Sequence, residues 1–581
     1  MLRALEDEGR ANLHSILVVK DGFVIAEASA PGYGANIWHL SHSMSKSVTG
    51  MAIGFLVDEG KLELSERLVD FFPEIASADK RFSSITVEHL LTMTSGVKFS
   101  EVGSVTDRAW TQSFFESQMA FAPGEKFHYN SMNSYMLSRI VASITGQTLT
   151  EFLTPRLFLP LGIKNFFWEK SPEGIEKGGW GLYMSAESWA RLGELYLNLG
   201  KYQGRQILSE DWVRKSTSRQ VVTDGSKGDF DYGYHLWVSK TGSDFLFNGM
   251  LGQNVWIVPD KNMVVSINSG NNELFLQSPA LSIIKDRLAN AEGKDRRIEA
   301  RRMKKAEKSF FESRRAIRPL KPKRGLASLF LLSPKKPFSL EFEPLLGTYT
   351  LAENNSGILP LFVRVMQSNY SGGIEQVAFT REKNSLFLIA TEGGKTSKIE
   401  LGIYGYKESL IDASGEKYLV RALAESVSDE RGTIYNIQLV FPELPNTRFI
   451  SVALLPDGEI SFNMTETPNH KMVEGFFEKL PSSHPKISFV LDAFEKKLGR
   501  GFALDRIRRA FSPSLTGANV NSDSFRRIID EAEEKEREEI DRARLVVSLA
   551  ERFIFLDENS DEDDKSGEKK RSFFSRLFSK K

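Results

Sequence analysis

The chain contains no cysteine among its 581 residues, so disulfide frameworks and thiolate chemistry are both excluded. It has no net charge, because 76 lysines and arginines balance 76 aspartates and glutamates, and this gives no general reason to expect a nucleic-acid partner. The eight histidines are scattered without metal-ligand spacing, so we expect neither a metal nor another cofactor.

Long apolar runs are also missing, and no window approaches the length of a membrane span. Charges occupy the first eight residues where a signal peptide needs an apolar core. The cytoplasm is therefore the expected location. Residues 569–581 alternate apolar and basic residues at helical spacing, which fits either an amphipathic helix on an anionic membrane surface or a disordered basic tail.

One short stretch carries the strongest chemical signal. Ser43 and Lys46 are spaced one helical turn apart, so the lysine amine can reach the serine hydroxyl. A serine needs such a base to become a nucleophile, and lysine acts as a base only when its environment favours the neutral amine. The apolar run 51–57 that follows predicts that Lys46 is carried into the interior.

The pattern of strands and helices predicts an α+β fold. Two β-rich runs, 15–20 and 23–28, are joined by Asp21-Gly22, a strong hairpin signal. Further strands are expected at 232–238, 245–248, 255–258 and 263–267, with mainly helical sequence over 100–170. These features predict an antiparallel sheet flanked by helices, with a helical subdomain inserted.

Six ordered motifs carry a family resemblance. They are Ser43-x-x-Lys46, 90–96, 123–131, 178–182, 191–197 and 249–253. In this order they resemble the serine beta-lactamase-like superfamily, in the branch of class C beta-lactamases, DD-peptidases, family VIII esterases and 6-aminohexanoate-dimer hydrolases. The resemblance covers about residues 10–290 and implies a beta-lactamase/transpeptidase-like fold.

The resemblance also implies roles for particular residues. Ser43 would be the acylated nucleophile, Lys46 the general base and Tyr129 the partner that passes a proton to the leaving group. Ser131 stands where the family has an asparagine that binds a substrate carbonyl. The backbone N-H of Met250, after Gly249, would join that of Ser43 in stabilising an oxyanion.

The third family motif has two candidate positions. The family's Lys-Thr-Gly or His-x-Gly aligns with Phe247-Asn248-Gly249, which offers no cation for a substrate carboxylate. A literal Lys240-Thr241-Gly242 occurs nearby, but its surroundings favour a hairpin turn.

These departures favour a serine hydrolase acting on an ester or amide of a small molecule or peptide over a true beta-lactamase. The alternative is a penicillin-binding-like sensor that keeps the fold without turnover.

Beyond residue 290 the composition changes. Basic residues dominate 294–336, whereas short β runs alternate with turns from 343 to 465. The β-rich part is similar to lipocalin-like domains attached to some serine hydrolases. The expected organisation is a hydrolase domain (1–292), a basic helix and linker (293–340), a β-barrel or sandwich (341–475), a helical segment (476–556) and a charged tail (557–581).

Overall fold

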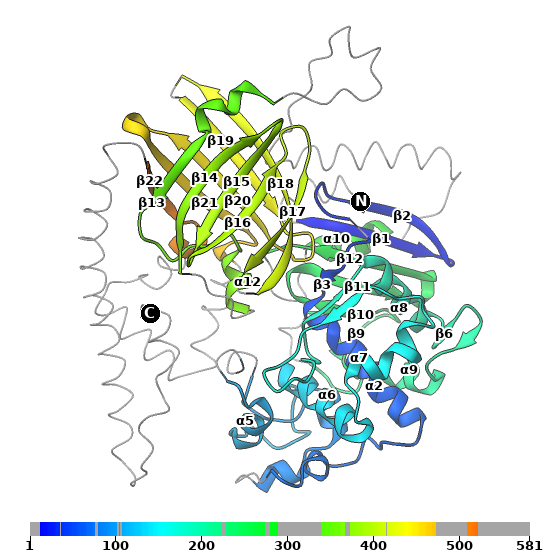
Figure 1. The fold of residues 1–581 in the computed structure, drawn as a ribbon. Coiled ribbons are helices and arrows are strands. Elements are labelled where there is room, and N and C mark those ends of the chain that lie inside the picture. The colour runs from blue at the N-terminus through cyan, green and yellow to red at the C-terminus, as the bar shows by residue number, and fades with distance from the viewer. Residues whose placement is uncertain are drawn as a thin grey trace, which may run out of the picture. The chain divides into compact units, whose positions relative to one another are not determined.

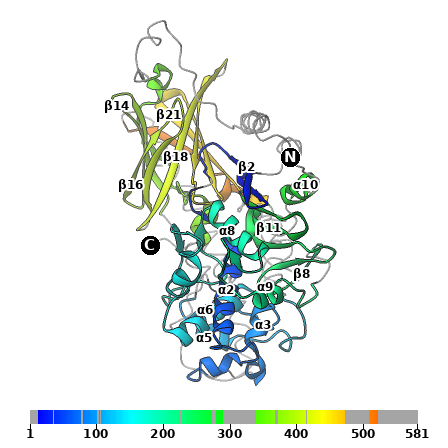
Figure 2. The ribbon, with the colours of Figure 1, turned by 90° about the vertical axis from the view of Figure 1, so that its right-hand side faces the viewer.

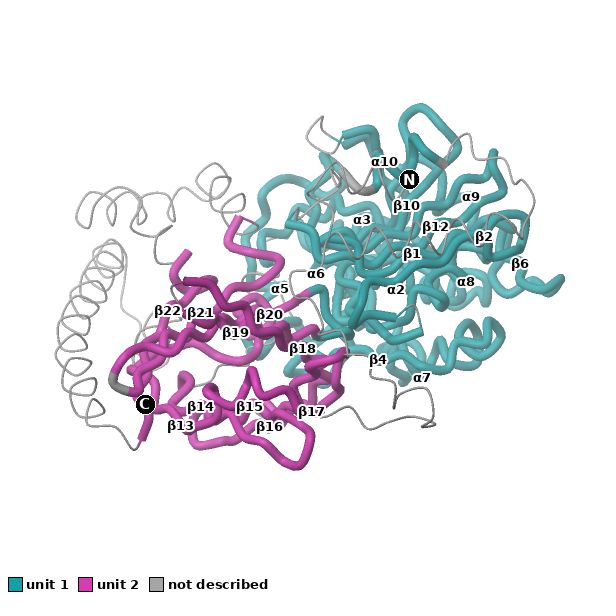
Figure 3. The backbone as a smooth tube through the Cα atoms, turned by 90° about the horizontal axis from the view of Figure 1, so that it is seen from above, with its two compact units in different colours: residues 1–315, 441–445 teal, residues 316–440, 446–581 magenta. Residues whose placement is uncertain are grey.

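The computed structural model describes most of the chain up to residue 520. The described residues are 12–34, 36–75, 80–100, 104, 107–223, 228–272, 279–288, 338–366, 372–413, 415–430, 432–471 and 508–520. The chain divides into two compact units, one of residues 1–315 with 441–445 and one of 316–440 with 446–581 (Figure 3). The predicted basic helix and linker, except for residues 338–340, and the predicted charged tail with its membrane-surface helix lie outside the described residues.

The first unit is built on a seven-stranded antiparallel sheet (Figure 1). Its order is β2-β1-β12-β11-β10-β9-β8, so strands from the two ends of the unit lie side by side. The strands span β1 Leu13–Lys20, β2 Phe23–Ser29, β8 Phe230–Tyr232, β9 Trp237–Ser239, β10 Phe245–Gly249, β11 Gln253–Val258 and β12 Met263–Ser269. This arrangement confirms the predicted antiparallel sheet.

The β1–β2 hairpin forms where its turn residues predict it. Lys20 pairs with Phe23, and Asp21 and Gly22 both have positive φ values, 53° and 75°. Such a turn matches the right-handed twist of the flanking strands. The predicted single strand 232–238 is wrong, however, because Gly233 and Leu236 close a tight turn between β8 and β9.

Both faces of this sheet are buried. Along β1, Leu17 and Val19 join the larger hydrophobic core, whereas Ile16 and Val18 join a second core on the other face. Side chains that alternate along a strand point to opposite faces, so a strand covered on both sides reads as a continuous apolar run.

Helices cover the two faces of the sheet (Figure 2). Helix α8 (Ala186–Leu197) packs on the β11 and β12 face, where a side chain at Gly193 would come within 2.5 Å of Val264. On the opposite face, α10 (Pro279–Leu288) contributes Leu281 and Ile284 to the second core.

The remaining helices of the first unit form the larger core and the inserted subdomain. They are α2 Ser45–Asp58, α3 Val87–Leu91, α5 Trp110–Glu116, α6 Ser131–Thr145, α7 Leu149–Leu153 and α9 Glu210–Ser216. Short strands β3 (His39–Leu40), β4 (Phe166–Trp168) and β5 (Leu182–Met184) form a small sheet, and β6 (Lys201–Tyr202) pairs with β7 (Arg205–Gln206). Among the described residues, no helix is both long enough and apolar enough to cross a membrane.

The second unit is one ten-stranded antiparallel sheet with the order β16-β15-β14-β13-β22-β21-β20-β19-β18-β17. The two end strands approach each other, because the Glu400 carboxylate forms an ion pair with Lys407 at 3.0 Å and its backbone N-H donates to Ser409 at 2.9 Å. The sheet is therefore nearly closed, which confirms the predicted barrel-like domain. The strands span β13 Gly347–Leu351, β14 Ile374–Glu382, β15 Ser385–Glu392, β16 Lys395–Leu401, β17 Lys407–Ala413, β18 Glu416–Asp429, β19 Gly432–Val440, β20 Thr447–Leu454, β21 Glu459–Thr467 and β22 Ser514–Asn519.

Strand β22 is an unexpected member of this sheet. It pairs with both β13 and β21, so residues distant in the sequence complete the middle of the sheet. The predicted helical segment 476–556 is wrong for these residues, and most of the rest of that segment lies outside the described residues.

Candidate active site

The predicted nucleophile lies at the start of a deeply buried helix. Ser43 occupies a short 3-10 helix, His42–Met44, which leads directly into α2. Every residue of α2 from Ser45 to Leu56 is buried, which explains why the helix has no polar face in the sequence. Ser43 itself remains partly exposed between two buried neighbours.

Lys46 is enclosed as the sequence predicts. Only 1% of its surface is exposed, and its Nζ lies 3.1 Å from Ser43 Oγ, 2.9 Å from Ser131 Oγ and 2.7 Å from the Gly179 carbonyl oxygen. A neutral amine has two N-H donors and one lone pair. It can therefore donate to Ser131 and Gly179 while accepting the Ser43 proton, which is the arrangement that a general base requires.

Tyr129 lies beside the Lys46 amine. Lys46 Nζ is 4.9 Å from the centroid of the Tyr129 ring, and that ring stacks on Trp237 with centroids 5.8 Å apart. Tyr232 packs edge-on against Tyr129 with centroids 6.2 Å apart, and burial raises the pKa of the Tyr232 phenol well above its ordinary value. The stacked aromatic rings thus fix the Tyr129 ring beside the amine.

Ser131 faces Lys46. Ser131 is the first residue of α6 and is 3% exposed. Asn130 caps this helix by accepting a hydrogen bond from the backbone N-H of Met132. The sequence assigned the Ser131 hydroxyl to a substrate carbonyl, whereas the structure shows it hydrogen-bonded to the amine. Ser131 is therefore placed to orient the Lys46 amine.

The strand β10 reaches the site through Gly249. A side-chain carbon at this position would lie 2.3 Å from the Ser41 carbonyl oxygen, so only glycine permits the close approach of β10 to the nucleophile segment. Met250 follows directly in the turn after β10. Phe247 points into the core against Trp189 and Tyr196, so the strand carries no cation at the family's lysine position.

The alternative third motif lies elsewhere. Lys240, Thr241 and Gly242 form the turn between β9 and β10, where Ser239 Oγ accepts the backbone N-H groups of Thr241 and Gly242. Lys240 Nζ donates to the Gly228 carbonyl at 2.9 Å. The structure therefore places Phe247-Asn248-Gly249, and not Lys240-Thr241-Gly242, beside the nucleophile segment.

This difference predicts unequal effects of two substitutions on hydrolysis of a neutral ester. Lys240→Ala should leave turnover within about threefold of wild type, as expected for a residue outside the site. Gly249→Val should reduce turnover by about 100-fold or more, because the new side chain would displace β10 and with it the backbone N-H of Met250, the predicted oxyanion donor.

Steady-state kinetics measure both effects, and Gly405→Val is a matched control at a glycine with open space around it. Thermal unfolding separates local displacement from global unfolding. A greater loss in Lys240→Ala than in Gly249→Val would contradict this placement of the third motif.

His235 is a component that the sequence did not reveal. Its Nδ1-H donates to the Leu91 carbonyl at 3.0 Å, its Nε2 accepts from Ser134 Oγ at 2.8 Å, and its own carbonyl accepts from Ser47 Oγ at 2.9 Å. Burial, together with the nearby charge of Lys46, lowers the His235 pKa to about 3. The neutral ring therefore joins α2, α6 and the end of α3 beneath the amine.

Two more histidines beside the nucleophile are held neutral in the same way. Burial lowers the pKa of His39 to about 4 and that of His42 to about 3, with His39 and Lys46 adding to the effect on His42. Among the described residues, no group of three or more histidine or acidic side chains is arranged to hold a metal ion.

These shifts predict acid-sensitive stability. Unfolded histidine titrates near pH 6.5, so the unfolded chain binds more protons than the folded one below that pH. Stability should fall as pH drops from about 6.5, by up to about 1.4 kcal/mol per pH unit for each such histidine. Urea unfolding at about pH 7 and about pH 5 measures the slope.

Replacing one of these buried histidines tests whether they cause the pH dependence of stability. His235→Asn replaces the ring by an amide that tolerates its positive φ of 59° and cannot take up the proton. The variant should therefore show a shallower slope. A slope unchanged from wild type would contradict the role of His235.

Comparison with known proteins shows which families the first unit resembles. The Beta-lactamase family model matches residues 2–274. A 6-aminohexanoate-dimer hydrolase of Paenarthrobacter ureafaciens is 26% identical over 281 residues, which cover 43% of this chain and 71% of the relative. Protein flp of Staphylococcus aureus strain MW2 is 28% identical over 170 residues, which cover 26% of this chain and only 34% of that protein.

Solved structures are also similar to part of the chain. A penicillin binding protein from Bacillus halodurans has 21% sequence identity and a TM-score of 0.39, with 50% of this chain and 99% of that chain covered. The family match and the six ordered motifs coincide in the first unit. Residues 2–274 therefore form a domain of the serine beta-lactamase-like superfamily.

Proposed function

We propose that the first unit is a serine hydrolase that cleaves an ester or amide bond through a covalent acyl-enzyme on Ser43. Its fold is that of the beta-lactamase-related hydrolases. The observation that carries the proposal is the distance of 3.1 Å between the buried amine of Lys46 and the hydroxyl of Ser43, a partly exposed residue. A nucleophile and base within hydrogen-bond reach are the signature of covalent catalysis.

Acylation follows from these contacts. Ser43 Oγ attacks the substrate carbonyl while its proton passes to Lys46 Nζ, and the carbonyl oxygen becomes an oxyanion facing the backbone N-H groups of Ser43 and Met250. When the tetrahedral intermediate collapses, the bond to the alcohol or amine breaks. The leaving group takes a proton from Tyr129, which recovers one from Lys46.

Deacylation repeats these steps with water. Water attacks the acyl carbonyl, gives its proton to Lys46 and releases the acid, and the Ser43 oxygen regains a proton. Ser131 and the Gly179 carbonyl keep Lys46 Nζ directed at Ser43 throughout. They act as positioning groups because they contact the base.

The substrate class follows from the missing cation. At the third motif, Asn248 accepts a hydrogen bond from Asn254 at 2.7 Å, and Phe247 is buried in the core. This position therefore offers no cation that could bind a substrate carboxylate. An ester or amide substrate, from a small molecule or a peptide, fits this site better than a beta-lactam. One relative is named for hydrolysis of a 6-aminohexanoate dimer, which supports a small-molecule substrate.

A fluorophosphonate probe tests the nucleophile directly, with intact-mass and peptide mapping as the readout. We expect one adduct, on Ser43. Ser131→Ala is the matched control, since Ser131 also contacts Lys46 but is only 3% exposed, and this variant should still be labelled. An adduct on any other residue would overturn the proposal.

Hydrolysis of p-nitrophenyl butyrate then separates an enzyme from a sensor. We expect continued release of p-nitrophenol over many equivalents. A burst of one equivalent without turnover would favour the penicillin-binding-like sensor, because acylation would then occur without deacylation.

A further inference from the structure

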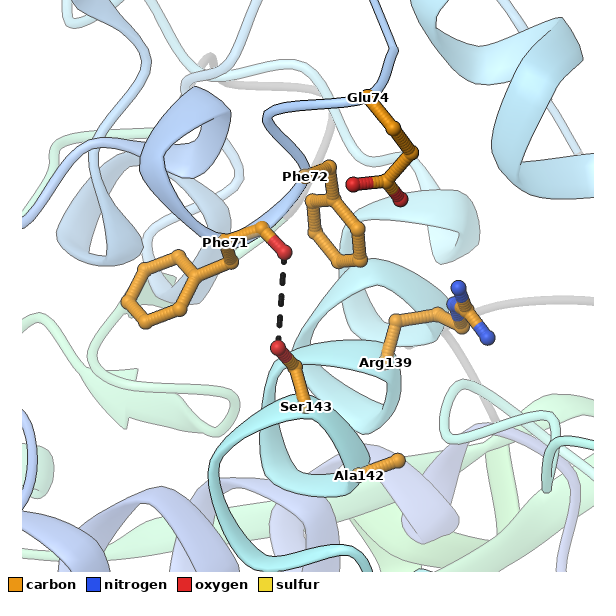
Figure 4. Close-up of a pocket in the computed structure, with 6 residues that line it drawn as sticks. All are labelled: Phe71, Phe72, Glu74, Arg139, Ala142 and Ser143. Carbon is orange, nitrogen blue, oxygen red and sulfur yellow. Dashed lines mark hydrogen bonds between the residues drawn. The ribbon is translucent and has the colours of Figure 1, made fainter.

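A separate pocket lies in the first unit, between α6 and the chain that follows the short 3-10 helix η2 (Leu68–Phe71). Its volume is about 280 Å³. Figure 4 shows the Phe72 ring, the Glu74 carboxylate and the Arg139 side chain on one side of Phe71, whose own ring points away from them. The lining residues are Phe71, Phe72, Glu74, Arg139, Ala142 and Ser143.

The pocket is distant from the catalytic centre. Arg139 and Ser131 both belong to α6, but at about 1.5 Å per residue they are about 12 Å apart along the helix axis. Ser143 Oγ donates a long hydrogen bond of 3.5 Å to the Phe71 carbonyl, which ties the helix to the opposite wall. A ligand here would not contact Lys46, so the inference does not depend on the proposed hydrolase activity.

Arg139 has an uncommon environment for a cation. Its guanidinium carbon lies 5.6 Å from the Phe72 ring centroid, and its Nε is buried without a hydrogen-bond partner. Within the part of the chain that the structure describes, no carboxylate forms an ion pair with it, although Glu74 lines the same pocket. By contrast, Arg67 and Arg156 of the same unit bind Asp70 and Glu59.

A buried donor without an acceptor needs an explanation, and a bound anion supplies one. Guanidinium groups match carboxylates particularly well, because two parallel N-H groups can bind both carboxylate oxygens. The stacking of Arg139 on Phe72 holds the cation in place before any ligand arrives.

We propose that this pocket binds the carboxylate of a small organic acid. The carboxylate pairs with the Arg139 guanidinium, and the hydrocarbon part packs on the Phe72 ring. Glu74 is exposed and lines the same pocket, so its negative charge disfavours ligands with more than one negative charge, such as phosphate and dicarboxylates. The volume is small for a ligand pocket, which limits the acid to a few carbon atoms.

Butyrate is a suitable probe, and neutral butyramide is its matched control. Titration of the full-length protein, followed by ligand-observed NMR, should show saturable butyrate binding and at least about tenfold weaker binding of butyramide. Inorganic phosphate should also bind at least about tenfold more weakly. Equal binding of butyrate and butyramide, or of butyrate and phosphate, would overturn the proposal.

Variants locate the binding site. Arg139→Gln should weaken butyrate binding by at least about tenfold, whereas Arg67→Gln, a matched change at a paired arginine, should not. Ser43→Ala should also bind butyrate normally. Ala142→Phe fills the pocket without changing a charge and should abolish binding even if Arg139→Gln fails to fold. Binding that survives Ala142→Phe, or is lost in Ser43→Ala, would place butyrate elsewhere and refute the proposal.

Discussion

Ser43→Ala should lower the turnover of p-nitrophenyl butyrate by about 10⁴- to 10⁶-fold, because loss of the nucleophile removes the acyl-enzyme route. The effect should fall on kcat, since the substitution removes only the hydroxyl and leaves the surrounding backbone and its N-H donors in place. Stopped-flow or long-time absorbance assays can follow the residual rate. This is the largest effect that the proposed mechanism predicts.

The stability of the variant should change little. Ser43 is partly exposed, and Lys46 retains Ser131 and Gly179 as partners when the Ser43 hydroxyl is lost. Thermal unfolding checks this expectation. Turnover within about tenfold of wild type in well-folded Ser43→Ala would show that another group carries the reaction.

Lys46→Met should lower turnover by about 10²- to 10⁴-fold, the usual contribution of a positioned general base. Methionine nearly preserves the length and volume of the side chain while removing the amine. The loss should appear in the rate of fluorophosphonate labelling as well, because labelling requires the same activation of Ser43. Labelling rates followed by intact mass provide the second measurement.

Lys61→Met is the matched control for this change. Lys61 lies just beyond the other end of α2 and is exposed, where it forms an ion pair with Glu59 at 2.7 Å. Its loss should leave turnover within about threefold, as is usual for surface substitutions. Equal losses of turnover in Lys46→Met and Lys61→Met would indicate a general effect of removing a positive charge. The loss in Lys46→Met could then not be attributed to removal of the base.

The contact at the centre of the candidate site could be predicted from the sequence, because its two residues are close in the chain. Ser43 and Lys46 lie within one turn, so their contact follows from local geometry. The apolar stretch after Lys46 correctly predicted its burial. The hairpin at Asp21-Gly22 was predictable for the same reason, since two adjacent residues determine the turn.

Contacts between distant segments could not be predicted in this way. Gly179 reaches Lys46 through its backbone carbonyl, and no side-chain pattern marks a carbonyl acceptor. His235 joins three helices from a turn between strands, and a single histidine in an apolar stretch carries no signal of that role. Ser131 was predicted to bind a substrate carbonyl, whereas its contact with Lys46 depends on the path of α6.

In the second unit, too, local strands could be predicted from the sequence but contacts between distant segments could not. Alternating apolar residues predicted the strands between 343 and 465, because one face of each strand points into the barrel-like core. Residues 514–519 form a short strand that is separated from its partners by a long intervening segment. Its pairing with β13 and β21 is a long-range event that local propensity does not encode.

That late strand has a consequence for how the second unit is made. During synthesis β13 and β21 leave the ribosome well before β22, so until residues 514–519 emerge both strands keep one edge with unpaired backbone N-H and C=O groups. Such edges recruit other chains as readily as their own missing strand. We therefore expect the nascent barrel to be most prone to aggregation during that interval. A protein truncated before residue 514 would keep two unpaired edges permanently and would be prone to aggregation.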